Sequence, residues 1–370
     1  MQADWHWMAQ ALALARLGRF TTTPNPRVGC VIVKDGQLVG EGYHRKAGEP
    51  HAEVHALRMA GDLARGATAY VTLEPCSHHG RTPPCADALI AAGVTRVVAA
   101  MEDPNPLVAG RGLRRLAAAG IQVASGLMEA DALALNAGFV QRMRSGRPRV
   151  TVKLAASLDG RTALANGQSQ WITGPQARAD VQLGRAQACA ILTGADTVLT
   201  DDPALNVRWA ELPESVRAQY AEADLRQPIR VIVDGQQRVT ADARLFSLPG
   251  PIWLAREQVE GKWPAAVSQV PLPREPASGK LSLPALLDAL GARGINELWV
   301  EAGRQLAGAL LSQSLVDELL LYQAPLLMGE AAQGLLSLPV YTQMSQAPRL
   351  ELLELRQLGQ DIRLRLRPQV

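Results

Sequence analysis

Four residues between positions 51 and 85 constrain the fold of this 370-residue chain more than any other feature. His51 and Glu53 lie in the stretch PHAEVHA, and Cys76 and Cys85 lie in LEPCSHHGRTPPCAD. One imidazole and two thiolates are a sufficient protein ligand set for a zinc ion that keeps its fourth position open to water. A carboxylate two residues after the histidine is suited to move the protons of such a water. The chain must therefore fold so that three separate segments meet around one ion.

The local sequence around these residues favours a catalytic site. The letters TPPC are typical of a helix start, with Thr82 as the N-cap and Pro83 in the first helical position. Cys85 then lies in the first turn, where the helix dipole favours a thiolate. Cys76 follows a predicted strand, and His51 follows a proline at another predicted helix start. The order H-x-E, P-C and a second cysteine is the pattern of nucleobase-type deaminases.

Two other interpretations of the cluster are open from the residues alone. His51 and His55 have the i, i+4 spacing of metalloprotease helices, but that motif needs Glu directly after the first histidine, where this chain has Ala52. His55 is therefore expected to pack against the site or to support it. A structural zinc site would need a fourth protein ligand, which His78 or His79 could supply. Catalytic zinc is the interpretation that we carry forward.

Composition indicates two domains and limits the partners. A chain of this length with 47% hydrophobic residues can form two cores. The formal charge of +3 and the 4% of aromatic residues do not require nucleic acid as a partner. No uncharged apolar run approaches the roughly 18 residues that span a bilayer, and Asp4 and Arg16 interrupt the N-terminal stretch, so we expect neither a membrane partner nor a signal peptide. The four cysteines favour a reducing cytoplasm, with Cys30 and Cys189 as core thiols in apolar strands.

The first domain is predicted to cover residues 1–146 and to have three α/β/α layers, because helix and strand patterns alternate along it. Two of its predicted helices begin near residue 4 and near residue 51. Three more cover residues 84–93, 111–120 and 129–143. Its predicted strands are 28–33, 37–44, 67–73, 95–101 and 121–125. Asp35 and Gly36 are expected to turn the first strand into the second. The breakers Ser145, Gly146 and Pro148 set the boundary.

The second domain is predicted to cover residues 147–370 and to be another α/β domain. Its predicted strands are 149–157, 188–194, 229–234, 251–255, 297–301, 352–359 and 360–367, the last two turning at Gly359. Its predicted helices are 175–185, 283–292 and 302–313. The Pro- and Gly-rich residues 257–280 are expected to form a surface loop.

Long motifs in both halves resemble those of a known family. Eight residues separate Cys76 from Cys85, whereas tRNA and cytidine deaminases have P-C-x-x-C. The stretch PCSHHGRTPPC, with TPNPRVGCVIV before it and EDPNPLVAGRG after it, resembles the bifunctional riboflavin-biosynthesis deaminase/reductases. The resemblance continues through VKLAASLDGRTA, SQWITG, GADTVLTDDPALNVR and WVEAG, so it covers nearly the whole chain. It implies a cytidine-deaminase-like N-terminal domain and a dihydrofolate-reductase-like C-terminal domain.

The family resemblance also implies two consecutive reactions on one pyrimidine ribonucleotide. The deaminase converts 2,5-diamino-6-ribosylamino-4(3H)-pyrimidinone 5′-phosphate into the corresponding aminouracil, and the reductase uses NADPH to turn the ribosyl side chain into a ribityl one. By this resemblance one Zn²⁺ per chain is held by His51, Cys76 and Cys85, and Glu53 is the proton shuttle. Asn25, His44 and the loop 78–82 would lie near the pyrimidine or the phosphate. Arg81 has the charge for a phosphate, although a loop arginine is equally often only solvated.

The reductase residues come from the resemblance rather than from an independent motif. No G-x-G-x-x-G follows a strand, which disfavours a Rossmann domain, and WVEAGRQLAGALL offers only a helix N-terminus for a pyrophosphate. The positions expected to contact NADPH are Ala155, Trp171, Thr197, Asp201 and the turn from Gly303. The positions expected to contact the substrate are Ser169, Arg185, Leu205, Arg208 and Glu301. Without the resemblance, the two arginines would be read as surface ion pairs and Trp171 as core packing. Lys153 and Asp201 are the candidates for protonating the opened sugar.

Two rival functions are distinguishable by experiment. One is a tRNA or nucleobase deaminase with a non-catalytic C-terminal binding domain, which would act on an anticodon and not on the pyrimidine nucleotide. The other keeps the deaminase and makes the second half an assembly module that does not bind NADPH. The sequence leaves open whether the chain forms a homo-oligomer.

Overall fold

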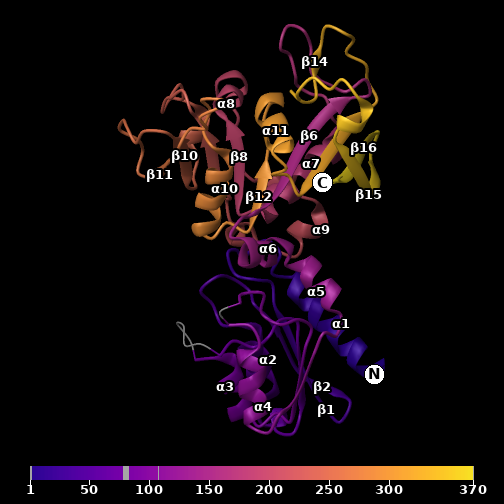
Figure 1. Ribbon diagram of the computed structural model, residues 1–370. Helices are drawn as coiled ribbons and strands as arrows, with labels where there is room; N and C mark the ends of the chain where they lie inside the picture. Colours follow the sequence, from indigo (N-terminus) through magenta and orange to yellow (C-terminus); the bar gives the residue numbers. More distant parts are fainter. Residues whose placement is uncertain (1, 78–82, 107, 370) are drawn as a thin grey trace. The chain divides into compact units, whose positions relative to one another are not determined.

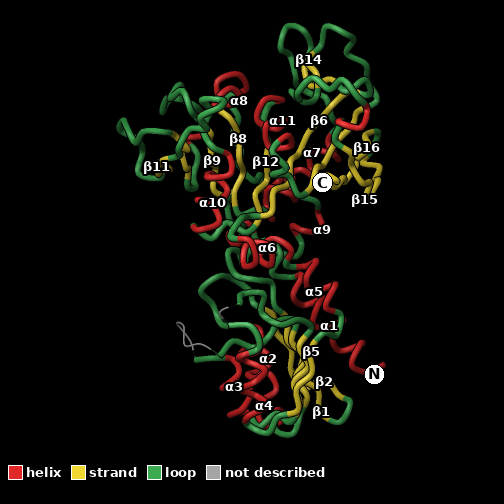
Figure 2. The backbone as a smooth tube through the Cα atoms, in the orientation of Figure 1, coloured by secondary structure: helices red, strands yellow, loops and turns green. Residues whose placement is uncertain are grey.

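The chain divides into two compact units, residues 1–146 and 147–370, in a computed structural model that describes residues 2–77, 83–106 and 108–369 (Figure 1). Within those ranges, no helix has both the length and the apolar character needed to cross a membrane. Each unit is a β-sheet with helices on both faces, as Figure 2 shows for the strands in yellow and the helices in red. This arrangement confirms two α/β domains of the expected class.

The first unit contains a five-stranded sheet of order β2-β1-β3-β4-β5. Its strands are β1 (Gly29–Lys34), β2 (Gln37–Tyr43), β3 (Thr68–Val71), β4 (Arg96–Ala99) and β5 (Gln122–Ser125). Its helices are α1 (Gln2–Arg16), α2 (Ala52–Ala60), α3 (Cys85–Ala92), α4 (Arg111–Ala118), α5 (Glu129–Leu135) and α6 (Ala137–Ser145), with a 3₁₀ turn at Gly61–Ala64. Strands β1–β2 and β1–β3 are antiparallel, whereas β3–β4 and β4–β5 are parallel.

Alternating side chains of these strands build two separate cores. In β1, Cys30 and Ile32 pack with α2 and α3, while Val31 and Val33 pack on the opposite face with α1. This is the expected period of two, which puts successive strand residues on opposite faces of the sheet. The hairpin turn at residues 35–36 has φ angles of 51° and 74°, as the Asp-Gly pair predicts.

Two helix boundaries of the first unit differ from the prediction. Helix α3 begins at Cys85 with Pro84 as N-cap, so the expectation that Pro83 opens the helix is wrong. A residue that precedes proline is disfavoured in the helical region, which excludes Pro83. The expected N-cap Thr82 lies outside the described residues.

The helix predicted over 129–143 is in fact two helices, α5 and α6, separated at Asn136. The buried Asn136 side chain accepts the Arg27 backbone N–H (2.8 Å) and donates to the Arg27 carbonyl (2.9 Å). The Arg27 guanidinium also donates to the carbonyl of Leu135 (2.6 Å), the last residue of α5. Long-range hydrogen bonds therefore break a helical pattern that is continuous in the sequence.

The second unit contains a nine-stranded sheet of order β11-β10-β9-β8-β12-β6-β13-β16-β15 and a small sheet of β7 and β14. The strands are β6 (Arg149–Ser157), β7 (Arg161–Ala163), β8 (Ala190–Gly194), β9 (Ile229–Val233), β10 (Ile252–Arg256), β11 (Val267–Pro271), β12 (Glu297–Val300), β13 (Glu318–Ala324), β14 (Gln333–Gly334), β15 (Arg349–Leu358) and β16 (Asp361–Gln369). The helices are α7 (Pro175–Gln187), α8 (Ala195–Asp201), α9 (Glu214–Arg217), α10 (Leu283–Ala292) and α11 (Arg304–Ser312). Short 3₁₀ turns cover Trp209–Glu211, Glu222–Asp224, Arg244–Ser247 and Met344–Gln346.

Seven neighbouring strands of this sheet, from β11 to β13, are parallel, and β16 and β15 complete it antiparallel. Strand β11 contradicts the expectation that residues 257–280 are only a loop, because Val267–Pro271 pairs with β10 along the sheet edge. An edge position tolerates the proline that ends this strand. Strand β13 was not predicted from the sequence.

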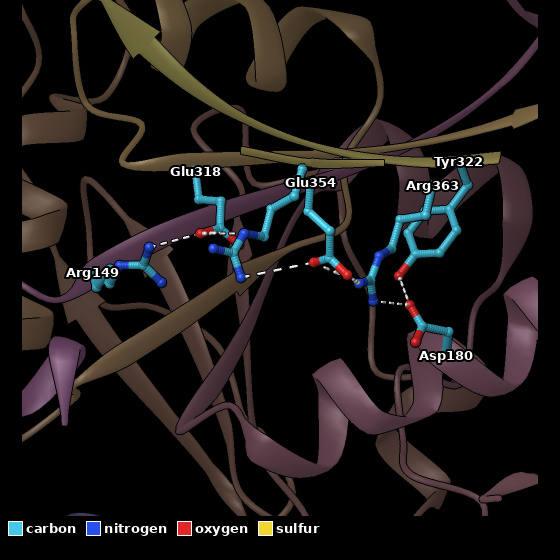
Figure 3. Close-up of polar contacts among 7 residues, drawn as sticks. Arg149, Asp180, Glu318, Tyr322, Glu354 and Arg363 are labelled. Atoms are coloured by element: carbon cyan, nitrogen blue, oxygen red, sulfur yellow. Dashed lines mark hydrogen bonds and ion pairs between the residues drawn. The ribbon is translucent and has the colours of Figure 1, made fainter. Parts of the chain in front are cut away.

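A chain of alternating charges ties the antiparallel strands to helix α7 (Figure 3). The Arg363 guanidinium lies between Asp180 of α7 (2.8 Å) and Glu354 of β15 (3.0 Å). The Tyr322 hydroxyl of β13 also donates to Asp180 (2.7 Å), so one buried carboxylate joins two strands to the helix. At the other end of this network, Arg149 of β6 donates to Glu318 of β13 (2.7 Å).

Candidate functional site

The first turn of α2 carries His51 as N-cap and Glu53, and it lies against β2. The contact is close because β2 has glycine where it faces the helix. A Cβ added at Gly40 would lie 2.2 Å from the carbonyl oxygen of Ala56, and one at Gly42 would lie 2.7 Å from that of Ala52. The helix is thereby fixed on the sheet at the point where its first turn presents the histidine and the carboxylate.

The two cysteines meet His51 from other elements. Cys76 follows β3, and Cys85 is the first residue of α3. The Nδ1 atom of His51 lies 3.3 Å from the Sγ atom of Cys85 and 3.7 Å from that of Cys76. The three ligand atoms all lie within 4.8 Å of one another. The structure therefore brings together the three residues expected to bind metal.

The donor set fits a zinc ion. Tetrahedral zinc with Zn–S of about 2.3 Å and Zn–N of about 2.0 Å puts nitrogen and sulfur roughly 3.5 Å apart, and the two observed distances lie on either side of this value. The hydrogen bond between the thiols lowers the pKa of Cys76 to about 4 and raises that of Cys85, so the pair gives up one proton readily. A second thiolate requires a cation between the sulfurs, and a divalent ion supplies it.

Glu53 is buried beside this cluster, and its Oε2 atom has no hydrogen-bond partner among the described residues. Burial raises the pKa of Glu53 to about 7, although the nearby His51 opposes the shift. A carboxyl group with a pKa near neutrality exchanges protons in both directions. The unsatisfied oxygen is therefore placed for a polar group that binds at the site.

His44 and Asn25, expected near the pyrimidine or phosphate, form one hydrogen-bonded pair. The Nδ1 atom of the buried His44 donates to the carbonyl of Pro50 (3.2 Å), so its Nε2 atom accepts from the Asn25 amide (3.0 Å). Burial lowers the pKa of His44, which favours this neutral form. The His44 ring lies edge-on to His51, with centroids 5.6 Å apart. The loop 78–82, including Arg81 and the alternative ligands His78 and His79, lies outside the described residues.

In the second unit, the expected reductase residues gather at the carboxyl ends of parallel strands. Ala155 lies in β6, Thr197 and Asp201 lie in α8 directly after β8, and Gly303 follows β12 (Figure 1). Because β8, β12 and β6 are parallel neighbours, their carboxyl ends share one edge of the sheet. Open α/β sheets bind ligands at this edge.

A buried ion pair lies beneath this edge. Arg185 of α7 donates to Glu301 through Nε (2.5 Å) and Nη2 (2.8 Å), and each side chain is only 12% exposed. Burial opposes the charge of Glu301, but Arg185, with a smaller effect from Lys153, lowers its pKa to about 2. Burial lowers the pKa of Lys153. Arg185 is therefore not the surface ion pair that its sequence alone suggested.

The start of helix α11 is open. The Gly303 N–H donates to the Thr197 hydroxyl (3.2 Å), which brings two expected cofactor residues together. Gly303 is exposed, and a Cβ added there would meet only that hydroxyl, at 3.7 Å. Asp201 ends α8, and partial burial raises its pKa.

The remaining expected residues lie in loops. Arg208 pairs with Glu211 on the surface, as its ion-pair interpretation predicted. The Leu205 side chain is buried in the core beside α7, and its backbone has a φ of 46°, a strained region for leucine. Trp171 is 69% exposed, with the Arg178 guanidinium 4.7 Å from its ring centre, so the core-packing interpretation is wrong. Ser169 is half-buried in the loop before α7.

Sequence reasoning missed Trp299, whose indole N–H donates to the Glu301 carboxylate (2.9 Å). The two residues are two positions apart along an extended segment, a spacing that puts side chains on one face. The ring lies over Gly184 of α7, where an added Cβ would be 2.4 Å from it. The spacing was readable from the sequence, but the glycine opposite was not.

Comparison with known proteins identifies both halves. Residues 1–101 match the family described as "Cytidine and deoxycytidylate deaminase zinc-binding region", and residues 148–364 match "RibD C-terminal domain". The riboflavin biosynthesis protein RibD of Escherichia coli (strain K12) is 60% identical over 98% of this chain and 99% of its own length. The second match disfavours a nucleic-acid deaminase with a non-catalytic second half.

Solved structures agree over the whole chain. Acinetobacter baumannii RibD, form 1, is 46% identical with a TM-score of 0.91 and covers 100% of this chain and 99% of its own. A Thermotoga maritima diaminohydroxyphosphoribosylaminopyrimidine deaminase/5-amino-6-(5-phosphoribosylamino)uracil reductase is 32% identical with a TM-score of 0.86, again covering 100% and 99%. The chain therefore belongs to the RibD family, the bifunctional deaminase/reductases of riboflavin biosynthesis.

Proposed function

We propose that His51, Cys76 and Cys85 hold one zinc ion and that Glu53 moves the protons of a hydrolytic deamination. The observation that carries this proposal is the cluster of one imidazole nitrogen and two sulfurs within 4.8 Å, beside a buried carboxylate oxygen without a partner among the described residues. A zinc ion in such a site lowers the pKa of a bound water to about 7 and so makes a nucleophile available at neutral pH. The substrate is 2,5-diamino-6-ribosylamino-4(3H)-pyrimidinone 5′-phosphate.

Glu53 takes a proton from the attacking water and returns a proton to the departing amine. The raised pKa of Glu53 suits both transfers, because near neutral pH the protonated and the ionised carboxyl group have similar free energies. His44 stays neutral and holds the Asn25 amide beside the site, which fixes the direction in which that amide can bind a ring substituent.

The second reaction takes place at the carboxyl edge of the nine-stranded sheet. NADPH supplies a hydride there; Ala155, Trp171, Thr197, Asp201 and the turn from Gly303 would hold it. The fit rests on the exposed start of α11, because backbone N–H groups at a helix N-terminus bind phosphates. Ser169, Arg185, Leu205, Arg208 and Glu301 would bind the nucleotide. Arg208 suits the phosphate, because its side chain reaches the surface and a phosphate can take the place of Glu211 as its anionic partner.

Lys153 protonates the sugar oxygen that the hydride transfer releases. Its ammonium lies near Glu301 and Arg185, and burial lowers its pKa toward the range in which a proton is given up. Asp201 is the competing donor. At saturating NADPH, which removes any effect of Asp201 on cofactor binding, single-turnover NADPH oxidation should slow in Lys153→Met and stay near wild type in Asp201→Asn; the reverse result would exchange the two roles.

A coupled assay tests the whole function. The diamino nucleotide and NADPH are added to the full chain, and ammonia and NADPH are followed together. Omitting NADPH should stop the second step and leave the first. Glu53→Gln should release no ammonia but still oxidise NADPH when the aminouracil nucleotide is supplied. Ammonia release from Glu53→Gln at the wild-type rate would overturn the proposed role. We place both steps in the cytoplasm, supported by four cysteines that are all free.

A further inference from the structure

Glu74 is a buried carboxylate that follows β3, and the chemistry proposed above does not use it. Its Oε2 atom accepts the backbone N–H groups of Asp103 (3.0 Å) and Gly110 (2.8 Å). Its Oε1 atom accepts those of Gly112 (2.7 Å) and Leu113 (3.4 Å). Both oxygens of one side chain are thus occupied by amides of a different segment.

Three of these amides belong to the start of helix α4. Gly110 is its N-cap, and residues 112 and 113 are in its first turn, where N–H groups have no acceptor within the helix. The positive end of the helix dipole stabilises the carboxylate charge. The helix also touches the next residue of the loop, because a Cβ at Gly112 would lie 1.9 Å from the carbonyl oxygen of Pro75. Helix α4 therefore holds both Glu74 and Pro75.

The residue that follows is the zinc ligand Cys76, and helix α3 holds it from the other side. The Cys76 carbonyl accepts the N–H of Ala86 (3.1 Å), and its Sγ atom accepts the N–H of Cys85 (3.3 Å). One helix fixes the two residues before the ligand and another fixes the ligand itself. The direction of the Cys76 side chain is set between them.

We propose that Glu74 is a positioning residue that sets the geometry of Cys76 as a zinc ligand. The inference rests on the proposed function, in which Cys76 binds the metal. In Glu74→Gln, the side-chain NH₂ would face two backbone N–H groups that it cannot accept. Two of the four hydrogen bonds between residue 74 and the segment 103–113 would then be lost. Changes in residues that orient metal ligands weaken metal binding by about 10- to 100-fold, and we expect a loss in this range.

The test measures zinc affinity on the full chain by competition with a chelator. Glu74→Gln is compared with Tyr70→Phe, which removes a hydrogen bond to Asp4 (2.6 Å) from β3, the strand that precedes Glu74, and leaves the hydrogen bonds of residues 74–76 in place. Glu74→Asp, which keeps the charge, provides a second variant if Glu74→Gln does not fold. Melting temperature, the deaminase kcat and KM, and the reductase rate are measured on each variant.

We expect zinc affinity to fall about 10- to 100-fold in Glu74→Gln and less in Glu74→Asp. Tyr70→Phe should bind zinc as the wild type does, and reductase rates should be unchanged throughout. Zinc affinity within twofold of wild type in a folded Glu74 variant would overturn the inference. So would an equal loss of zinc in Tyr70→Phe, which would show a general effect of destabilisation. A wild-type chain that binds no zinc would instead contradict the proposed function, in which His51, Cys76 and Cys85 hold the ion.

Discussion

The ion pair of Arg185 and Glu301 gives a prediction with a magnitude and a sign. The change is Glu301→Gln, which removes the carboxylate charge and nearly keeps its shape. The pKa of Glu301 falls from 4.5 to about 2 in the folded protein. At about 1.36 kcal/mol per pH unit, this lowering corresponds to about 3 kcal/mol of stability at neutral pH. Both side chains are mostly buried, so solvent screening removes little of it.

The lowered pKa of Glu301 also determines how the stability difference between wild type and Glu301→Gln varies with pH. A carboxyl group with a lowered folded-state pKa stabilises the fold fully above its unfolded pKa, and the contribution disappears as pH falls through the folded value. The difference between wild type and Glu301→Gln should therefore be about 3 kcal/mol at pH 7 and shrink between pH 4.5 and about 2. Loss of the Glu301 charge leaves the Arg185 guanidinium with the carbonyl of Asn206 (3.1 Å) as its remaining hydrogen-bond acceptor among the described residues, which adds to the cost at neutral pH.

Urea unfolding followed by tryptophan fluorescence measures this difference. Five of the seven tryptophans (171, 209, 253, 263 and 299) lie in the second unit, so the signal reports mainly on its unfolding. Glu257→Gln is the matched control, because it removes the same charge from the exposed partner of Arg274 and should cost less than about 1 kcal/mol. A Glu301→Gln loss below about 1 kcal/mol, or one that stays constant down to pH 3, would refute the reasoning.

Three further changes probe other contacts. Trp299→Phe removes the indole N–H from Glu301, so reductase kcat/KM should fall about tenfold at an unchanged deaminase rate; equal rates would show that this hydrogen bond does not matter. Arg208→Gln should raise the reductase KM for the phosphorylated nucleotide about tenfold and alter stability by less than about 1 kcal/mol, whereas an unchanged KM would leave Arg208 as a surface ion pair only. Asn136→Ala should destabilise the first unit by about 1 to 3 kcal/mol, measured by melting temperature, and an unchanged melting temperature would contradict the role of Asn136 in dividing α5 from α6.

The clustering of His51, Cys76 and Cys85 and most strands were predictable because their signals are local. The H-x-E and P-C letters lie at ends of elements, and the alternation in β1 assigns each side chain to a face. The Asp-Gly turn between β1 and β2 needs no information from the rest of the chain.

The features that were not predicted from the sequence depend on residues far away along the chain. The break at Asn136 comes from Arg27, more than a hundred residues earlier, and strand β11 exists because β10 offers it an edge. The buried pairing of Arg185 with Glu301 joins α7 to the end of β12, and an arginine pattern alone gives no sign of burial. The four amides around Glu74 likewise become visible only after α4 has packed against the loop.

The most direct test of the account counts zinc bound per chain in wild type, Glu53→Gln and Cys85→Ser. The account predicts one zinc in the first two proteins, deaminase activity only in the wild type, and loss of the metal in Cys85→Ser with the reductase still active. Wild-type zinc content in Cys85→Ser, or a wild-type chain that deaminates without zinc, would contradict it.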